Sequence, residues 1–228
     1  MKTVFPPSPS PVVPVAGTAA VFPVRRIFCV GQNYAAHARE MGSDPTKTEP
    51  CFFSKPGDAV VVNGIAIPFP SATQNLHYEI ELVAALLGGG ANIPVDKALD
   101  HVFGYAAGID LTRRDLQAAA KKAGNPWDMA KGFDRSAPIG TIAPASVIGH
   151  PAKGGIRLSV NGAVRQSSDL SDMIWSVAAI IARLSQFVEL GAGDLIFTGT
   201  PQGVGPIRPG DRLVGGIDGV GTVSVTVG

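Results

Sequence analysis

The sequence predicts a single α+β protein in which strands outnumber helices, and three observations support this fold class. Glycine and proline, with 28 and 19 residues, make up about a fifth of the 228-residue chain, which favours short strands and turns over a helical bundle. The stretches with helical character do not alternate regularly with strands, which argues against a doubly wound parallel sheet. The length and the 45% hydrophobic content suffice to bury one large core.

Composition also narrows the classes of partner and the compartment. With a formal net charge of +1 and no long basic tract, the chain lacks the features of a nucleic-acid-binding or membrane-surface protein. The apolar helical stretch 177–182 is interrupted by Arg183 and is far too short to span a bilayer. The N-terminus does not have the charged-then-apolar pattern of a signal peptide. We therefore expect a cytoplasmic protein with no nucleic-acid and no membrane partner.

The two cysteines, Cys29 and Cys51, both have apolar neighbours in the sequence. We expect two buried thiols, and a disulfide between them is the alternative. No cysteine spacing typical of a metal site occurs.

Residues 1–23 are predicted to form an extended arm. Prolines at positions 6, 7, 9 and 11 exclude a regular ladder there, because proline has no amide hydrogen to donate. We expect no chemistry from this arm, and we expect residues 24–228 to form one domain.

Short strands are predicted along the rest of the chain. A hairpin over 158–166 turns at Asn161-Gly162, which is the strongest hairpin signal in the sequence. The other predicted strands cover residues 27–30, 52–53, 66–67, 78–87, 102–110 and 195–197, with glycine-broken strands after that to the C-terminus.

Three helices are predicted between the strands. The first is capped by Asn33 and runs through residue 41, and the second is capped by Thr112 and ends before Gly124. The third covers 171–190, because its apolar residues recur at spacings of three and four. The residues of that apolar face are Ile174, Val177, Ile181, Leu184 and Val188.

Two carboxylates in the predicted strand 78–87 are the first candidates for chemistry. Glu79 and Glu81 are two residues apart, so both side chains leave the same face of a strand, while Ile80 and Leu82 point into the core. Two adjacent negative charges repel each other, and a divalent cation would remove that repulsion. The alternative is an ordinary solvated strand face.

Asp110 extends this pair to a set of three. It closes an otherwise uncharged strand over 102–109, so it is either a helix-entry residue or a ligand directed into a site. Three carboxylates without a cysteine or an obvious histidine partner would select Mg²⁺, Mn²⁺ or Ca²⁺ over Zn²⁺. His77 shares the face of the glutamates, where it either packs or supports a ligand.

Three further segments carry functional candidates, each with a plainer alternative. Glu40 lies three residues after His37, so it can orient that imidazole as a general base, although such pairs also occur on ordinary surface helices. Lys131 lies among small and aromatic residues, where its charge could stabilise an oxyanion or could simply reach solvent. The glycine-rich loop 198–205 could bind an anion but lacks the lysine of a phosphate-binding loop.

Taken together, these motifs resemble the fumarylacetoacetate hydrolase family from about residue 24 to the C-terminus. Each motif alone is unspecific, but the occurrence of seven motifs in the same order across some 180 residues is specific for the family. In chain order they are Gly31-Gln32-Asn33-Tyr34, His37 with Glu40, Lys55-Pro56, Glu79-Ile80-Glu81, Gly108 to Asp115, Lys131-Gly132-Phe133-Asp134 and Thr198 to Gly205. The chain is most similar to the short bacterial members, the fumarylpyruvate hydrolases of the gentisate pathway and the acylpyruvases.

The resemblance implies a β-rich fold of layered mixed sheets with a few helices, similar to the C-terminal domain of the family, and a homodimer. It implies Mg²⁺ or Mn²⁺ in the site, with Ca²⁺ as a substitute in vitro. By this resemblance the metal ligands are Glu79, Glu81 and Asp110, and the dyad that activates water is His37 with Glu40. The resemblance also implies that Lys131 and Gln117 face the reacting carbonyl and that Thr200 faces the substrate carboxylate. Lys55 matches a family lysine that we place at the edge of the site and group with the substrate-binding residues.

The activity that the resemblance implies is metal-dependent hydrolysis of a C–C bond in a 2,4-dioxo acid. The leading substrate is fumarylpyruvate, an intermediate of aromatic catabolism, which would give fumarate and pyruvate. Oxaloacetate decarboxylation and diene-dioate isomerisation use similar chemistry and are the alternatives. A remoter alternative from another class is a non-catalytic binding module with a structural cation. Residues 42–50 and side chains beyond the metal would select the acyl group, but no spacing identifies them.

Overall fold

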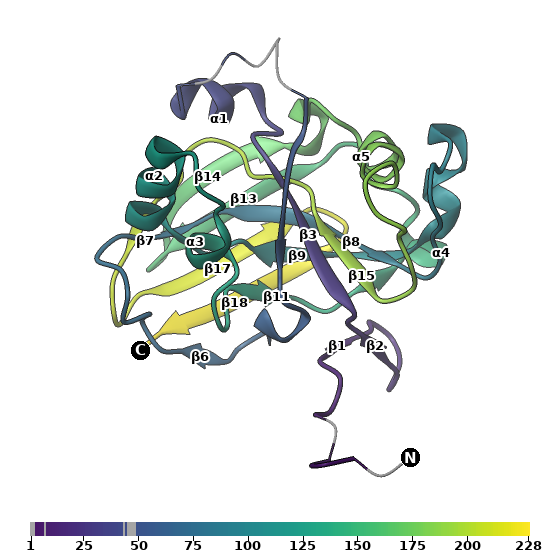
Figure 1. The fold of residues 1–228 in the computed structure, drawn as a ribbon, viewed down its shortest axis with the longest axis horizontal. Coiled ribbons are helices and arrows are strands. Elements are labelled where there is room, and N and C mark those ends of the chain that lie inside the picture. The colour runs from purple at the N-terminus through teal and green to yellow at the C-terminus, as the bar shows by residue number, and fades with distance from the viewer. Residues whose placement is uncertain (1–2, 7, 43, 45–48) are drawn as a thin grey trace.

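The computed structural model describes residues 3–6, 8–42, 44 and 49–228. Its centre consists of curved β-sheets packed against each other, with short helices around them (Figure 1). This arrangement confirms the strand-rich α+β class that the glycine and proline content predicts. Within the described residues, no helix combines the length and the apolar character that crossing a bilayer would require.

The larger sheet has eight strands and carries the carboxylates of interest. Its strands follow the order β4-β3-β15-β8-β9-β11-β5, with β12 paired to β9. Two of its strand pairs, β15 with β3 and β11 with β5, are parallel and the others are antiparallel, so the sheet is mixed. The strands are β3 (Arg26–Gly31), β4 (Cys51–Lys55), β5 (Val60–Val62), β8 (Ile80–Leu86), β9 (Val102–Ile109), β11 (Ala137–Ile139), β12 (Ala143–Pro144) and β15 (Asp194–Phe197).

A five-stranded sheet packs across the larger one, and two small sheets complete the strands. The five-stranded sheet has the order β14-β13-β17-β18-β6. Its strands are β6 (Ala66–Ile67), β13 (Gly155–Val160), β14 (Ala163–Asp169), β17 (Arg212–Ile217) and β18 (Gly221–Val227). The small sheets consist of β7 (Leu76–Tyr78) between β10 (Thr112–Arg113) and β16 (Gly205–Ile207), and of β1 (Val12–Pro14) with β2 (Val21–Pro23).

The helices are short and lie at the periphery. The α-helices are α1 (Ala35–Glu40), α2 (Arg114–Ala123), α3 (Asp128–Lys131), α4 (Ala145–Ile148) and α5 (Val177–Leu184), and the 3₁₀ turns are η1 (Gly57–Ala59), η2 (Val95–His101) and η3 (Leu170–Asp172). In Figure 1, α1, α2 and α3 lie on one side of the sheets, and α4 and α5 lie on the other. The first three border the candidate site.

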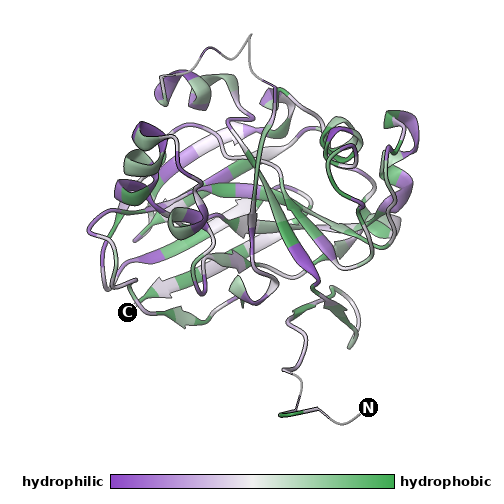
Figure 2. Ribbon diagram, in the orientation of Figure 1, coloured by the Kyte–Doolittle hydropathy of each residue, from purple (hydrophilic) through white to green (hydrophobic). Residues whose placement is uncertain are grey.

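The larger sheet is buried on both faces. Successive residues of β3 alternate between two hydrophobic clusters, since Phe28 and Val30 pack in one and Ile27 and Cys29 in the other. The first cluster fills the space toward the five-stranded sheet and α5. The central strands are therefore continuous hydrophobic runs, which are largely green in Figure 2.

The N-terminal arm contributes to the second cluster. The described residues before position 12 form no strand or helix. Beyond them, β1 and β2 form an antiparallel hairpin in which Val13 and Phe22 are buried against the larger sheet. The arm is thus more structured than its proline content suggests, because the two prolines of the hairpin, Pro14 and Pro23, stand at the ends of its strands.

The predicted helix over 171–190 is wrong in its length. Within this range only Val177–Leu184 is α-helical, with the Ser176 hydroxyl accepting from the amide of Ala179 as the N-cap. The residues before Ser176 are held by a distant segment, since the amide of Trp175 donates to the side-chain oxygen of Asn33 at 2.7 Å. Local periodicity cannot reveal such a long-range competitor for the helical hydrogen bonds.

The predicted caps of the other two helices are also wrong. Asn33 does not cap α1, because its side-chain oxygen accepts from the amide of Trp175 and its side-chain nitrogen donates to the carbonyl of Thr198 at 2.7 Å. Thr112 belongs to β10 and pairs with His77, so α2 begins two residues later. The predicted end of α2 is confirmed, because Gly124 adopts the left-handed conformation with φ of 68°.

Several local predictions are confirmed. The hairpin β13–β14 turns at Asn161 and Gly162, whose φ angles of 53° and 82° suit a tight hairpin turn. The strand predicted over 78–87 is present but divided, because β7 ends before Glu79 and β8 begins after it. Both cysteines are free thiols; the prediction of burial is confirmed for Cys29 and wrong for Cys51, which is exposed at the first position of the edge strand β4.

Asp194 provides a test of this architecture. Its fully buried carboxylate accepts hydrogen bonds from Arg26 at 2.7 and 3.1 Å and ties the start of β15 to the start of β3. Asp194→Ala should lower the free energy of unfolding by about 2–3 kcal/mol, because it leaves the guanidinium unpaired beside a buried strand. Urea unfolding measures this change.

The matched control is Asp218→Ala, which removes a solvent-exposed partner of Arg157. This change should cost less than about 1 kcal/mol, as exposed ion pairs do. Equal losses in the two variants would contradict the structural role of Asp194.

Candidate metal centre and active site

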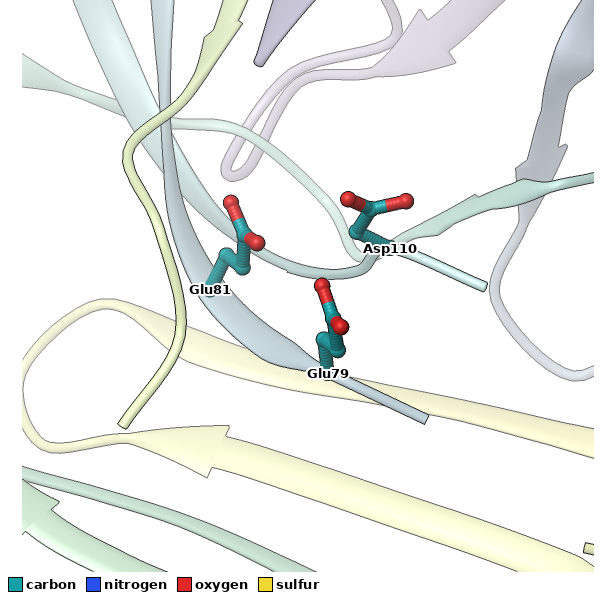
Figure 3. A group of neighbouring side chains, drawn as sticks. All are labelled: Glu79, Glu81 and Asp110. Atoms are coloured by element: carbon teal, nitrogen blue, oxygen red, sulfur yellow. The ribbon is translucent and has the colours of Figure 1, made fainter. Parts of the chain in front are cut away.

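Three carboxylates lie together at one end of the strand pair β8–β9. Ile80 pairs with Ile109, so Glu79 and Asp110 stand side by side just beyond the pair, and the amide of Asp110 donates to the carbonyl of Glu79 at 2.8 Å. Glu81 lies two residues along β8 on the same face. One oxygen of each carboxylate lies within 4.8 Å of the others. Figure 3 shows the three side chains directed toward a common space.

This cluster is buried, which excludes the alternative of a solvated strand face. Glu79, Glu81 and Asp110 are 5%, 1% and 0% exposed. Burial and the neighbouring charges of Asp110 and Glu79 raise the pKa of Glu81 well above its ordinary value. A set of oxygen donors that repel one another so strongly suits a hard divalent cation. The donor set therefore fits Mg²⁺ or Mn²⁺.

Protein cations surround the same carboxylates. Lys131, at the end of α3, contacts Glu79 at 2.8 Å and Asp110 at 2.6 Å through its ammonium group. Arg114, the first residue of α2, donates to the second oxygen of Glu79. Burial favours neutral groups, but Lys131 and Arg114 outweigh it and hold the pKa of Glu79 below its usual range. Asp110 and Glu79 likewise raise the pKa of Lys131 despite its burial.

The position of Lys55 differs from the expectation. It is fully buried below the triad, where its ammonium lies 2.8 Å from Asp110 and donates to the carbonyls of Leu111 and Lys131. It is not among the residues that line the pocket. Lys55 was expected at the edge of the site, but it neutralises and positions Asp110 from behind. The pairing of β3 with β4 brings it there, and no local pattern reveals that pairing.

The predicted pairing of His37 with Glu40 is present on α1. Nδ1 of His37 lies 3.0 Å from Oε2 of Glu40, and the other oxygen of Glu40 accepts from the amide of Gly203 at 3.2 Å. If Nδ1 carries the proton that bonds to Glu40, then Nε2 keeps a free lone pair. His37 is buried and lines the same pocket as the triad. The pair is therefore not an ordinary surface contact.

The glycine-rich loop closes another side of the site. The amide of Gly199 donates to Glu81 at 2.7 Å. The Thr200 hydroxyl donates to the carbonyl of Ile80 at 2.8 Å and accepts from Gln166 at 2.9 Å. Its single proton is therefore used within the protein, and the backbone amide is the donor of Thr200 that remains for a substrate.

These groups border one shared hollow. Gln117 lies in its wall and accepts a hydrogen bond from Arg114 at 2.5 Å. The structure thus brings seven of the nine predicted site residues to the pocket wall or the triad that borders it, with Glu40 directly behind His37 and Lys55 behind Asp110. The seven are His37, Glu79, Glu81, Asp110, Gln117, Lys131 and Thr200.

Eight further residues of the pocket wall were not among the predicted site residues, and four of them contribute a charge or an aromatic ring: Phe53, Arg114, Lys121 and Trp127. Arg114 belongs to a recognised motif, but its contact with Glu79 depends on how α2 packs beside β7. Phe53 and Trp127 form an aromatic pair with ring centroids 5.8 Å apart, and Lys121 lies near the same indole. The spacing of Arg114, Gln117 and Lys121 on one helix face could have indicated all three polar groups.

His77 stands behind the triad as a neutral group. Its Nε2 donates to Asn75 at 2.9 Å, and its Nδ1 accepts from Arg114 at 3.4 Å. Burial and the charge of Arg114 lower the pKa of His77 to about 4. His77 thus supports Arg114, which in turn holds Glu79, in agreement with the supporting role expected for it.

Comparison with known proteins gives a consistent result. Residues 26–228 match the family of the fumarylacetoacetate hydrolase C-terminal domain. The chain is 53% identical to fumarylpyruvate hydrolase from Pseudomonas aeruginosa, whose crystal structure contains Mn²⁺ and pyruvate. The two structures superpose with a TM-score of 0.97 over 99% of each chain.

Relatives with other activities are also similar. Mitochondrial oxaloacetate tautomerase from Mus musculus is 44% identical over 196 residues, which is 86% of this chain and 88% of the relative. The 2-hydroxyhepta-2,4-diene-1,7-dioate isomerase from Mycobacterium marinum is 34% identical, with a TM-score of 0.79 over 95% of this chain and 76% of the other.

The environment of His77 predicts a pH dependence of stability. Its pKa is about 4 when folded and about 6.5 when unfolded, so the unfolded chain binds more protons between these values. This contribution to stability is present above pH 6.5 and is lost as the pH falls toward 4. The free energy of unfolding should fall between pH 7 and pH 4.5 in both the wild type and His77→Gln. The fall should be about 1–2 kcal/mol smaller in His77→Gln, a value that is reduced because His77 is partly exposed.

Urea unfolding with a chelator at both pH values measures this difference. Carboxylates that titrate in the same window are common to both proteins and cancel in the comparison. An identical loss in His77→Gln and the wild type would exclude the proposed environment of His77.

Proposed function

The chain belongs to the fumarylacetoacetate hydrolase family, and on this premise we propose that it is a metal-dependent hydrolase of acylpyruvates, acting chiefly on fumarylpyruvate. The reaction adds water across a C–C bond and yields fumarate and pyruvate. The observation that carries this proposal is the shared pocket, in which a buried carboxylate triad faces a histidine held by a glutamate. Such a pocket provides both a cation site and a base that can activate water.

Glu79, Glu81 and Asp110 are the proposed ligands of Mg²⁺ or Mn²⁺. When bound, the cation supplies positive charge that stabilises the oxyanions of the dioxo acid and of the departing pyruvate enolate. Lys55 and the amide of Gly199 hold the ligands Asp110 and Glu81 in place. The hydrolase from Pseudomonas aeruginosa, which contains Mn²⁺ and pyruvate, supports this choice of ion.

His37 is the proposed general base. Because Nδ1 is held by Glu40, Nε2 can take a proton from a water molecule in the pocket. The oxygen of that water bonds to the carbonyl carbon of the acyl group. The bond between this carbon and the methylene group then breaks, and its electron pair remains on the pyruvate fragment. The proton that His37 accepted restores the methyl group of pyruvate.

Lys131 and Gln117 are the proposed partners of the reacting carbonyl. The ammonium of Lys131 has three N–H donors, of which two bond to Glu79 and Asp110, so one remains for the substrate. The side-chain oxygen of Gln117 accepts from Arg114, which leaves its amide hydrogens available. The backbone amide of Thr200 remains the proposed contact of the substrate carboxylate.

Decarboxylation and isomerisation remain the alternatives within the family, in view of the tautomerase and isomerase relatives. These reactions do not require an activated water molecule, whereas the His37–Glu40 pair is suited to providing one. A non-catalytic module with a structural cation would have no use for a base facing its cation. Hydrolysis therefore accounts for more of the site than any alternative.

We also propose that the protein acts in the cytoplasm as a homodimer in the gentisate branch of aromatic catabolism. This proposal is supported by the family resemblance and by the similarity to a fumarylpyruvate hydrolase.

A substrate panel tests the proposed function. Fumarylpyruvate, maleylpyruvate, acetylpyruvate and oxaloacetate are each supplied with Mg²⁺ or Mn²⁺, and the ultraviolet absorbance of the dioxo acid is followed. Fumarylpyruvate should have the highest kcat/KM, and chelation should abolish the reaction. Turnover of oxaloacetate alone would replace hydrolysis by one of the alternatives.

Two variants separate the base from the metal ligands. His37→Ala should lower kcat by at least about a hundredfold while Mn²⁺ still raises the melting temperature, because the imidazole does not belong to the triad. Glu79→Ala should lose both hydrolysis and the stabilisation by Mn²⁺. Full hydrolase activity in His37→Ala would exclude the proposed base.

A further inference from the structure

We propose that Lys121 binds the carboxylate at the far end of the substrate and thereby makes the pocket selective for acylpyruvates whose acyl group ends in a carboxylate. This inference rests on the proposed function of the same pocket and extends it to the choice of acyl group. Its starting observation is that Lys121 lines the pocket from the same helix as Arg114 and Gln117.

Helix α2 runs along the pocket away from the triad. Positions 114, 117 and 121 are separated by three and then four residues, so their side chains share one face. Arg114 contacts Glu79, and Gln117 contacts Arg114. Lys121 lies seven residues beyond Arg114, which corresponds to about 10 Å along the helix axis. One face of α2 therefore places a second cation of the pocket wall, Lys121, about two helical turns from the one that contacts Glu79.

This separation matches the proposed substrate. Fumarylpyruvate has a seven-carbon chain with a carboxylate at each end. Six bonds of an extended chain span about 7 Å, since the three bonds of one extended residue span about 3.5 Å. With one end at the triad, the other carboxylate comes within reach of the flexible lysine side chain. The aromatic pair of Phe53 and Trp127 lines the wall between and suits the apolar, unsaturated middle of the chain.

Lys121 is also the pocket cation whose charge is not already neutralised. Lys131 and Arg114 are both paired with Glu79. Among the residues that the structure describes, Lys121 forms no ion pair, and its ammonium lies 5.9 Å from the centre of the Trp127 ring. A cation on an aromatic face keeps its charge available for an anion.

A purely structural role is the competing explanation. Lys121 lies in the last turn of α2, where any positive charge is favourable because of the helix dipole. Lys122 lies in the same turn and shares that role, but it does not line the pocket. The chain therefore offers a matched control at the next position.

The test compares Lys121→Met, Lys121→Arg and Lys122→Met with the wild type. The ratio of kcat/KM for fumarylpyruvate to kcat/KM for acetylpyruvate, which ends in a methyl group, is the readout. Lys121→Met should lower this ratio about tenfold, mainly through a higher KM for fumarylpyruvate, as expected for the loss of a hydrogen bond between charged groups. Lys121→Arg should restore most of the ratio, and Lys122→Met should leave it unchanged.

Binding of the product provides a second readout that does not depend on turnover. Fumarate and crotonate, which lacks the second carboxylate, are titrated by calorimetry into the Mn²⁺-loaded proteins. Lys121→Met should weaken fumarate binding about tenfold and change crotonate binding much less.

The outcomes separate this inference from the proposed function. Equal changes for both ligands, or the same ratio in Lys121→Met as in Lys122→Met, would overturn the role of Lys121. A selective loss of fumarate affinity in a protein that hydrolyses neither substrate would uphold the carboxylate subsite and overturn the hydrolase function instead.

Discussion

The structure of the site depends on the neutralisation of three carboxylates buried at one point. Glu79, Glu81 and Asp110 carry a formal charge of −3, and the ammonium and guanidinium groups of Lys55, Lys131 and Arg114 supply +3. These cations belong to β4, α3 and α2. Their ion pairs with Glu79 and Asp110 therefore connect elements that are distant in the sequence. The cluster is formally neutral by itself, and a divalent cation brings it to +2. A pocket with that charge favours an anionic substrate such as a dioxo acid.

Buried ion pairs seldom stabilise a fold as much as apolar packing would, because desolvation offsets most of their attraction. Their retention here is therefore best explained by function. The strand pair β8–β9 is rigid because both of its faces are packed, and it holds the ligands at fixed separations. The proposed base, His37, in contrast lies on the short helix α1.

Sequence patterns predicted the parts of the site that depend on local geometry. Glu79 and Glu81 followed from the alternation of a strand, and His37 with Glu40 followed from the spacing of a helix. The position of Lys55 could not be predicted, because it depends on which strand pairs with β3 and in which register. The helix over 171–190 was overestimated for a related reason, since its first turns give their backbone hydrogen bonds to Asn33, more than 130 residues earlier. Where the local pattern competes with a distant partner, the sequence alone does not reveal which one prevails.

The proposed ligands lie at one end of the strand pair β8–β9, so a bound ion would depend on the correct pairing of these strands. Glu79 and Asp110 lie beside each other only when Ile80 faces Ile109. A register shift of one residue between β8 and β9 would turn carboxylates of the shifted strand to the opposite face of the sheet. The three carboxylates would then no longer form a common cation site. Because an ion stabilises only the state that binds it, the metal would favour the correct pairing over its nearest error. The same ion that is proposed for catalysis would then also stabilise the correctly paired fold, which contains its binding site, over the mispaired one.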